Sequence, residues 1–136
     1  MPGVTWDPEK DYLDNVPKDR YNLAAMLLKP VRDDLKQFTR NLLEPVNPYT
    51  GQAIKDDPAL ISISILNENS MLISVSHPLS IEKEQYVKAF ERQAKERKLT
   101  LTEKNYDPEF RKFAMEVYRD YFEDMKGFLR NEIRTK

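Results

Sequence analysis

Apolar residues return at helical spacing over the first third of the chain. The stripe steps by four, four, four, three and four positions through Leu23, Leu27, Val31, Leu35, Phe38 and Leu42, which is the spacing of one buried helix face. Pro30 falls inside the stripe, but the phase is kept across it, whereas a loop would usually reset the phase. We therefore predict one kinked helix over about residues 20–44, with this stripe facing the core.

Two later segments carry helix-start signals. Ser80 is placed to cap a helix over about residues 81–97, whose core-facing residues are Tyr86, Val87, Phe90 and Ala94. In "NYDPEF", Asp107 as N-cap and Pro108 at the first helical position predict a last helix. We expect this helix to run to about residue 133.

Between these helices the period changes from helical spacing to strict alternation. Isoleucines alternate with serines over residues 61–65, and a second alternating run over residues 71–76 follows the connector "NENS". Such alternation predicts a β-hairpin at residues 60–76 with one apolar face and one serine-rich face. The run "LTLT" at residues 99–102 favours a third short strand.

The ends of these elements define the organisation of the chain. Pro2, Pro8 and Pro17 predict an extended N-terminal arm over residues 1–18. An Asn-Pro turn and a closing Asp-Pro predict a long loop at residues 45–59. We expect a single α+β domain over residues 19–136, in which the hairpin and the third strand pack against three helices.

Composition supports a helix-rich globular domain and leaves the partner open. The chain has 136 residues, is 40% hydrophobic and 33% charged, carries a formal charge of -1, and holds only three glycines. It is therefore neither disordered by composition nor so basic that nucleic acid must be its partner. The sequence has no cysteine, no secretory-signal pattern at its start and no membrane-length apolar run, so we expect a cytoplasmic protein without membrane contact.

The chain lacks the residues that most enzymes need. Cysteine is absent and His77 is the only histidine, so a nucleophile–base pair or a zinc site has little to draw on. No glycine-rich nucleotide motif or calcium loop is present. A magnesium site could use the carboxylates Glu116, Asp120, Glu123 and Asp124, but a solvated acidic helix face explains them more simply. We expect a protein that is not an enzyme, with no cofactor and no metal.

Cations form ridges on the first and last helices. Their members recur at every fourth residue: Arg32, Lys36 and Arg40 on the first helix, and Lys126, Arg130 and Arg134 on the last. If the two ridges lie side by side, they suit a phosphate backbone and predict salt-dependent nucleic-acid binding. The competing interpretation is that the cations lie on solvated helix faces.

The last helix has more apolar surface than a small sheet can cover. We therefore predict a homodimer held by its C-terminal half, with Tyr121, Met125, Phe128 and Leu129 as the central contacts. The alternative is full burial of these residues within a monomer.

The arm combines aromatic, aliphatic and acidic residues. Trp6, Tyr12 and Leu13 lie among Asp7, Glu9, Asp11 and Asp14, a pattern suited to docking in an apolar groove rimmed by basic residues. The groove can belong to the same chain or to a partner. Together these features favour a non-catalytic protein–protein interaction protein, such as an adaptor, a chaperone-like protein or an inhibitor. A nucleic-acid-binding accessory protein is the alternative.

Overall fold

The computed structural model describes residues 21–66 and 81–135, and helices account for 68% of this part of the chain. Two helices lie close together near its beginning, α2 (Tyr21–Leu27) and α3 (Lys29–Leu43). A short 3-10 helix, η2 (Ile54–Asp56), follows in the loop after α3. The later helices are α5 (Ile81–Glu96), α6 (Tyr106–Gly127) and a π-helical end, η3 (Phe128–Ile133).

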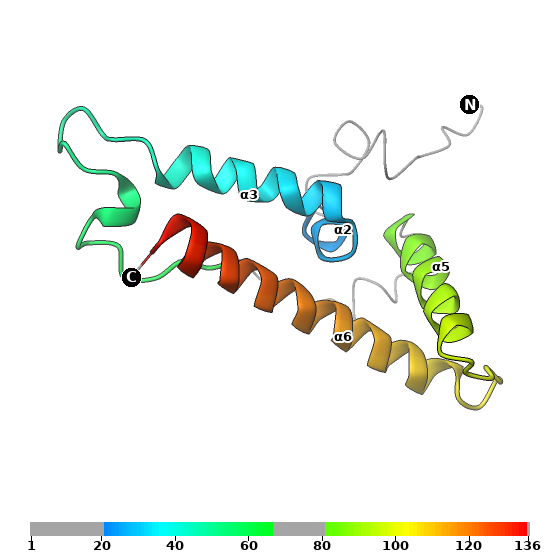
Figure 1. Cartoon of the computed structure of the whole chain (residues 1–136). Helices are drawn as coiled ribbons and strands as arrows, with labels where there is room; N and C mark the ends of the chain where they lie inside the picture. Colours follow the sequence, from blue (N-terminus) through cyan, green and yellow to red (C-terminus); the bar gives the residue numbers. More distant parts are fainter. Residues whose placement is uncertain (1–20, 67–80, 136) are drawn as a thin grey trace, which may run out of the picture.

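The longest helix, α6, is the support on which the others pack. In Figure 1, α3 lies beside the C-terminal half of α6 and runs in the same direction, while α5 crosses near the start of α6. The short helix α2 contacts α3, α5 and α6. The loop from residue 44 to residue 66 passes around the end of the molecule where α3 and η3 finish (Figure 1).

The core contains two regions of large side chains along α6, one around Phe90 near its start and one around Tyr121, Met125 and Phe128 at its C-terminal end. Near its start, the ring of Phe90 from α5 packs against Tyr106, Phe110 and Phe113, with centroids 5.2, 5.4 and 5.7 Å away. Four consecutive residues of α2, from Leu23 to Met26, are buried. A helix buried on most of its sides, as α2 is, ties these two regions into one core.

The predicted α+β fold is wrong. The described residues form no strand, and their only β-pairing is a single bridge between Val46 and Ala53. Neither residues 60–66 nor the run at 99–102 forms a strand. Residues 67–76, which would make up the rest of the hairpin, lie outside the described residues.

The alternating residues 61–65 form no strand pair in the described part of the chain, and only two of their three isoleucines pack on the core. Ile63 and Ile65 pack against the helical core, whereas Ile61 is 95% exposed. A segment laid over helices can bury every second side chain without a neighbouring strand, because the pattern is set by burial alone. In the run at 99–102, Leu101 packs on the core and Thr102 closes a turn by hydrogen bonds with Asn105.

The predicted kinked helix over residues 20–44 is also wrong, because it is two helices. Leu28 adopts an extended conformation between α2 and α3, with φ -100° and ψ 115°. Pro30 then falls in the first turn of α3, where a missing N–H breaks no intrahelical hydrogen bond. The proline thus marks the beginning of a new helix.

Two later helices agree closely with expectation. The predicted helix at 81–97 corresponds to α5, and helical structure from α6 through η3 ends at Ile133, as predicted. The start differs, because α6 begins at Tyr106 with Asn105 as the capping residue. Pro108 is tolerated inside the first turn, where backbone N–H groups have no intrahelical acceptor.

Candidate functional site

A charged seam joins α3 to the C-terminal half of α6. Lys36 Nζ lies 2.7 Å from Asp124 Oδ1, and Arg32 Nη1 lies 3.3 Å from Asp124 Oδ2. Arg32 also donates through Nε to the carbonyl oxygen of Ala25 at 3.0 Å. One carboxylate of α6 therefore holds two cations of α3, and one of these cations also binds the end of α2.

The cations of this seam also cover aromatic rings. The guanidinium carbon of Arg32 lies 5.3 Å from the ring centroid of Tyr121. Lys36 Nζ and the guanidinium carbon of Arg40 lie 5.6 and 4.9 Å from the centroid of Phe128. These distances fall within the range of cation–π attraction. Arg40 pairs in addition with Glu132.

The electrostatics of Asp124 follow from this arrangement. Burial raises the pKa of Asp124. The hydrogen bonds and charges of Lys36 and Arg32 together lower this pKa by more than burial raises it, so it lies below its ordinary value of 3.8. The side chains of Arg32 and Lys36 are only 17% and 18% exposed. The seam is thus a partly buried ion-pair network that includes aromatic faces.

The basic ridge of α3 is part of this seam and faces α6. Arg32, Lys36 and Arg40 are the three ridge residues, and each is paired with a carboxylate of α6 or η3. On the other predicted ridge, Lys126, Arg130 and Arg134 are exposed, and Lys126 pairs with Glu123 at 3.2 Å. The two ridges therefore do not present a joint row of six free cations.

The residues predicted to hold a dimer are buried within the single chain. Tyr121, Met125, Phe128 and Leu129 are 0%, 3%, 1% and 8% exposed. The prediction assumed that a small sheet leaves the C-terminal half of the last helix uncovered. Instead, α3 contacts η3 and is joined to α6 at Asp124, and Leu60, Ile63 and Ile65 line a groove together with Lys126 and Leu129.

Two large apolar side chains of α3 are left uncovered. Phe38 and Leu42, which we call the outer stripe, are 64% and 52% exposed. The sequence pattern predicts Phe38 and Leu42 in the core, and the structure corrects this. They are four residues apart, so they lie in one row along the helix.

The buried face of α3 is displaced by about one residue from the predicted one. Val31 and Leu43 are buried, Leu35 packs on the core, and Thr39 between them donates to the carbonyl oxygen of Leu35 at 2.8 Å. The observed row continues from Val31 and Leu35 through Thr39 and Leu43. The predicted row starts with the same two residues but continues through Phe38 and Leu42. The signal that could have separated them is the spacing of Arg32 and Arg40, which are eight residues apart, as are their partners Asp124 and Glu132.

The remaining candidates are the arm residues, His77 and the acidic cluster of the last helix. Trp6, Tyr12, Leu13 and His77 lie outside the described residues. Each acidic residue of the predicted cluster has a basic partner: Glu116 pairs with Arg97, Asp120 with Arg119, Glu123 with Lys126, and Asp124 with Lys36. Hydrogen bonds from Arg97 hold the pKa of Glu116 below its ordinary value. Within the described ranges, no three His, Cys, Asp or Glu residues are grouped as metal ligands.

No protein-family model matches the chain, and comparison with curated proteins and with solved structures gives no match. The geometry of the outer stripe and of the seam beneath it therefore carries the functional argument.

Among the described helices, none has both the length and the apolar character needed to cross a membrane.

Proposed function

We propose that this protein is a non-catalytic, cytoplasmic binding protein that docks another protein chain onto the outer stripe of α3. The observation that carries the proposal is the orientation of α3, whose cations face α6 while Phe38 and Leu42 face outward. Apolar residues are usually the ones buried on an amphipathic helix. Exposed apolar rows of this kind are typical of surfaces that become buried in a complex.

The stripe has the form used in helix recognition by grooves. Residues at every fourth position present one apolar edge, and polar side chains flank it, with Gln37 donating to Asn41 at 2.9 Å. The seam beneath the helix fixes its rotation, so little ordering is needed when a partner binds. An adaptor, a chaperone-like protein or an inhibitor would use such a preformed edge to occupy a partner's surface.

The partner can be another protein or a second copy of the chain. A homodimer proposed here would form through α3 and not through Tyr121, Met125, Phe128 and Leu129, which are buried. Nucleic-acid binding through the two basic ridges gains no support, because the α3 cations are paired with Asp124 and Glu132.

Site-specific photocrosslinking in the native host tests the proposal. A photoreactive residue placed at position 38 or 42 should give a discrete adduct, identified by mass spectrometry. The same residue at position 115, where Met115 is 51% exposed on α6, is the matched control. An adduct of twice the chain mass would identify a homodimer. No discrete adduct at positions 38 and 42, or equal adducts at position 115, would contradict the proposal.

A further inference from the structure

A groove lies between the loop after η2 and the C-terminal end of the long helix. Its volume is about 510 Å³, within the range of protein binding sites. Leu129, Leu60, Ile63 and Ile65 give it apolar walls. It is separate from the outer stripe, because none of the stripe residues lines it.

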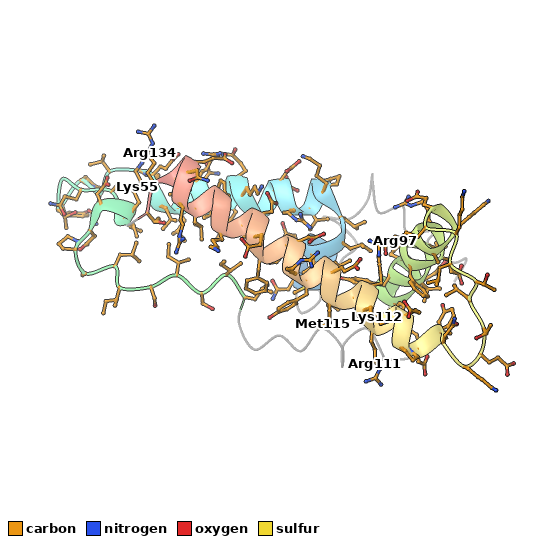
Figure 2. All side chains as sticks on the ribbon, turned by 60° about the horizontal axis from the view of Figure 1, so that its bottom comes forward. Lys55, Arg97, Arg111, Lys112, Met115 and Arg134 are labelled. Carbon is orange, nitrogen blue, oxygen red and sulfur yellow. The ribbon has the colours of Figure 1, made fainter. Side chains whose placement is uncertain are left out.

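Among the charged residues that line the groove, cations outnumber carboxylates. Lys55, Lys126 and Arg130 line it, against one carboxylate, Asp57. Lys55 and Arg130 form no ion pair with any residue in the described ranges, unlike the cations of α3. Figure 2 shows Arg134 at the same end of the molecule as Lys55. The groove therefore combines an apolar interior with a rim on which Lys55 and Arg130 are unpaired within the described residues, while Lys126 pairs with Glu123.

This chemistry matches one segment of the same chain. We propose that the groove binds the acidic, aromatic segment at residues 5–14, "TWDPEKDYLD", in the same molecule. The segment carries four carboxylates against one lysine and includes Trp6, Tyr12 and Leu13. Aromatic anchors contribute large contact area at low entropic cost, and the carboxylates are complementary to the rim. This inference does not depend on the outer stripe.

The length of chain before α2 allows the segment to reach the groove. The hydroxyl of Tyr21 donates to the carbonyl oxygen of Val31, so the start of α2 lies near the start of α3. The 15 residues of α3 span about 22 Å at 1.5 Å per residue. The chain from Trp6 to Tyr21 can cover up to about 50 Å. The groove, at the far end of α3, is within that reach.

Fluorescence of Trp6, the only tryptophan, tests the proposal in the full chain. Its emission should be shifted to shorter wavelength than that of a synthetic peptide of residues 1–20. In the variant K126E/R130E the emission should return to that of the peptide. The matched control is Arg111→Glu with Lys112→Glu, which reverses the same number of charges on the other half of α6 and should leave the emission unchanged.

Charge exchange makes the test specific to the rim. Asp7→Lys, Glu9→Lys and Asp11→Lys together should abolish the shift in the wild-type groove and restore it in the K126E/R130E groove. Emission equal to that of the peptide in the wild type, or unchanged in K126E/R130E, would overturn the proposal. A shift that grows with protein concentration would place the segment in a second copy and overturn the same-chain assignment.

A disulfide trap gives a readout that does not depend on fluorescence. Because the chain has no cysteine, a pair introduced as Tyr12→Cys with Ile61→Cys is the only possible bridge within one molecule. Ile61 lines the groove and is 95% exposed. This pair should oxidise within one chain several-fold faster than Tyr12→Cys with Met115→Cys, which lies away from the groove (Figure 2). Equal rates for the two pairs would overturn the proposal.

Discussion

Lys36 and Asp124 join α3 to α6 through a hydrogen bond of 2.7 Å between Nζ and Oδ1, although they are 88 positions apart in the sequence. Asp124 also accepts from Arg32, so one carboxylate holds two successive turns of α3. Because the side chains of Arg32 and Lys36 are only 17% and 18% exposed, this contact sets the rotation of α3 about its own axis. Phe38 and Leu42 then face outward.

Replacing Asp124 should loosen the seam. We expect Asp124→Asn to lower the free energy of unfolding by about 1–2 kcal/mol, because it leaves Arg32 and Lys36 poorly solvated without their counter-charge. The loss is modest because the Asp124 side chain is 37% exposed, so solvent screens part of the interaction. Urea denaturation measures the change. Asp120→Asn is the control: among the described residues Asp120 pairs only with the exposed Arg119 next to it, so less than about 0.5 kcal/mol should be lost.

Asp124 should also make the free energy of unfolding depend on pH in the acid range. Folding lowers the pKa of Asp124 below 3.8, so its stabilising contribution is fully present above that ordinary value and is lost as pH falls through the folded-state pKa. The stability difference between wild type and Asp124→Asn should therefore stay constant near neutrality and shrink below about pH 4. Urea titrations across this range would show a constant difference if the seam did not form.

Two buried tyrosines should respond in opposite ways to loss of their hydroxyl groups. Tyr121 Oη is buried and has no hydrogen-bond partner in the described structure, and burial raises the pKa of Tyr121 to about 12. Tyr121→Phe should raise the free energy of unfolding by about 1 kcal/mol. Tyr86 Oη donates to the carbonyl oxygen of Leu23 at 3.1 Å, so Tyr86→Phe should lower it by a similar amount. Thermal unfolding compares the two, and equal signs would contradict the prediction.

Glycine at position 98 should stabilise the protein. Lys98 follows α5 with φ 55°, and the backbone bonds Leu99 N to Ala94 O and Lys98 N to Lys95 O form a helix-ending motif that favours glycine. Lys98→Gly removes the steric cost of a side chain in this left-handed conformation, a gain of about 0.5–1 kcal/mol. Lys95→Gly, inside α5, should instead cost about 1 kcal/mol. Chemical denaturation of both variants checks the signs.

Two adjacent leucines of α3 test its orientation directly. Leu43 is 4% exposed and Leu42 is 52% exposed. Leu43→Ala should cost about 2–4 kcal/mol, whereas Leu42→Ala should change the free energy of unfolding by less than about 0.5 kcal/mol. Denaturation midpoints of the two variants decide the point. The reverse ranking would restore the core stripe that the sequence predicts.

The sequence by itself determined where most helices form. Apolar spacing in residues 81–97 and the start signals near Pro108 act within a few turns, so they located α5 and the last helix to within about two residues. Pro30 also indicated a local break in the first helix. The unbroken apolar phase predicts a kink at this position, whereas the structure shows the beginning of a new helix. These signals depend on neighbours in the chain and need no knowledge of distant contacts.

Only the tertiary structure decided which faces are covered. The rows through Phe38 and Leu42 and through Thr39 and Leu43 are both compatible with Val31 and Leu35, and the choice depends on Asp124, which is remote in sequence. The isoleucines at residues 63 and 65 likewise pack on helices and pair with no strand in the described part of the chain. Periodicity reveals that a face is apolar, but burial is a contact between segments, so the partner that covers each face emerges only when the helices pack.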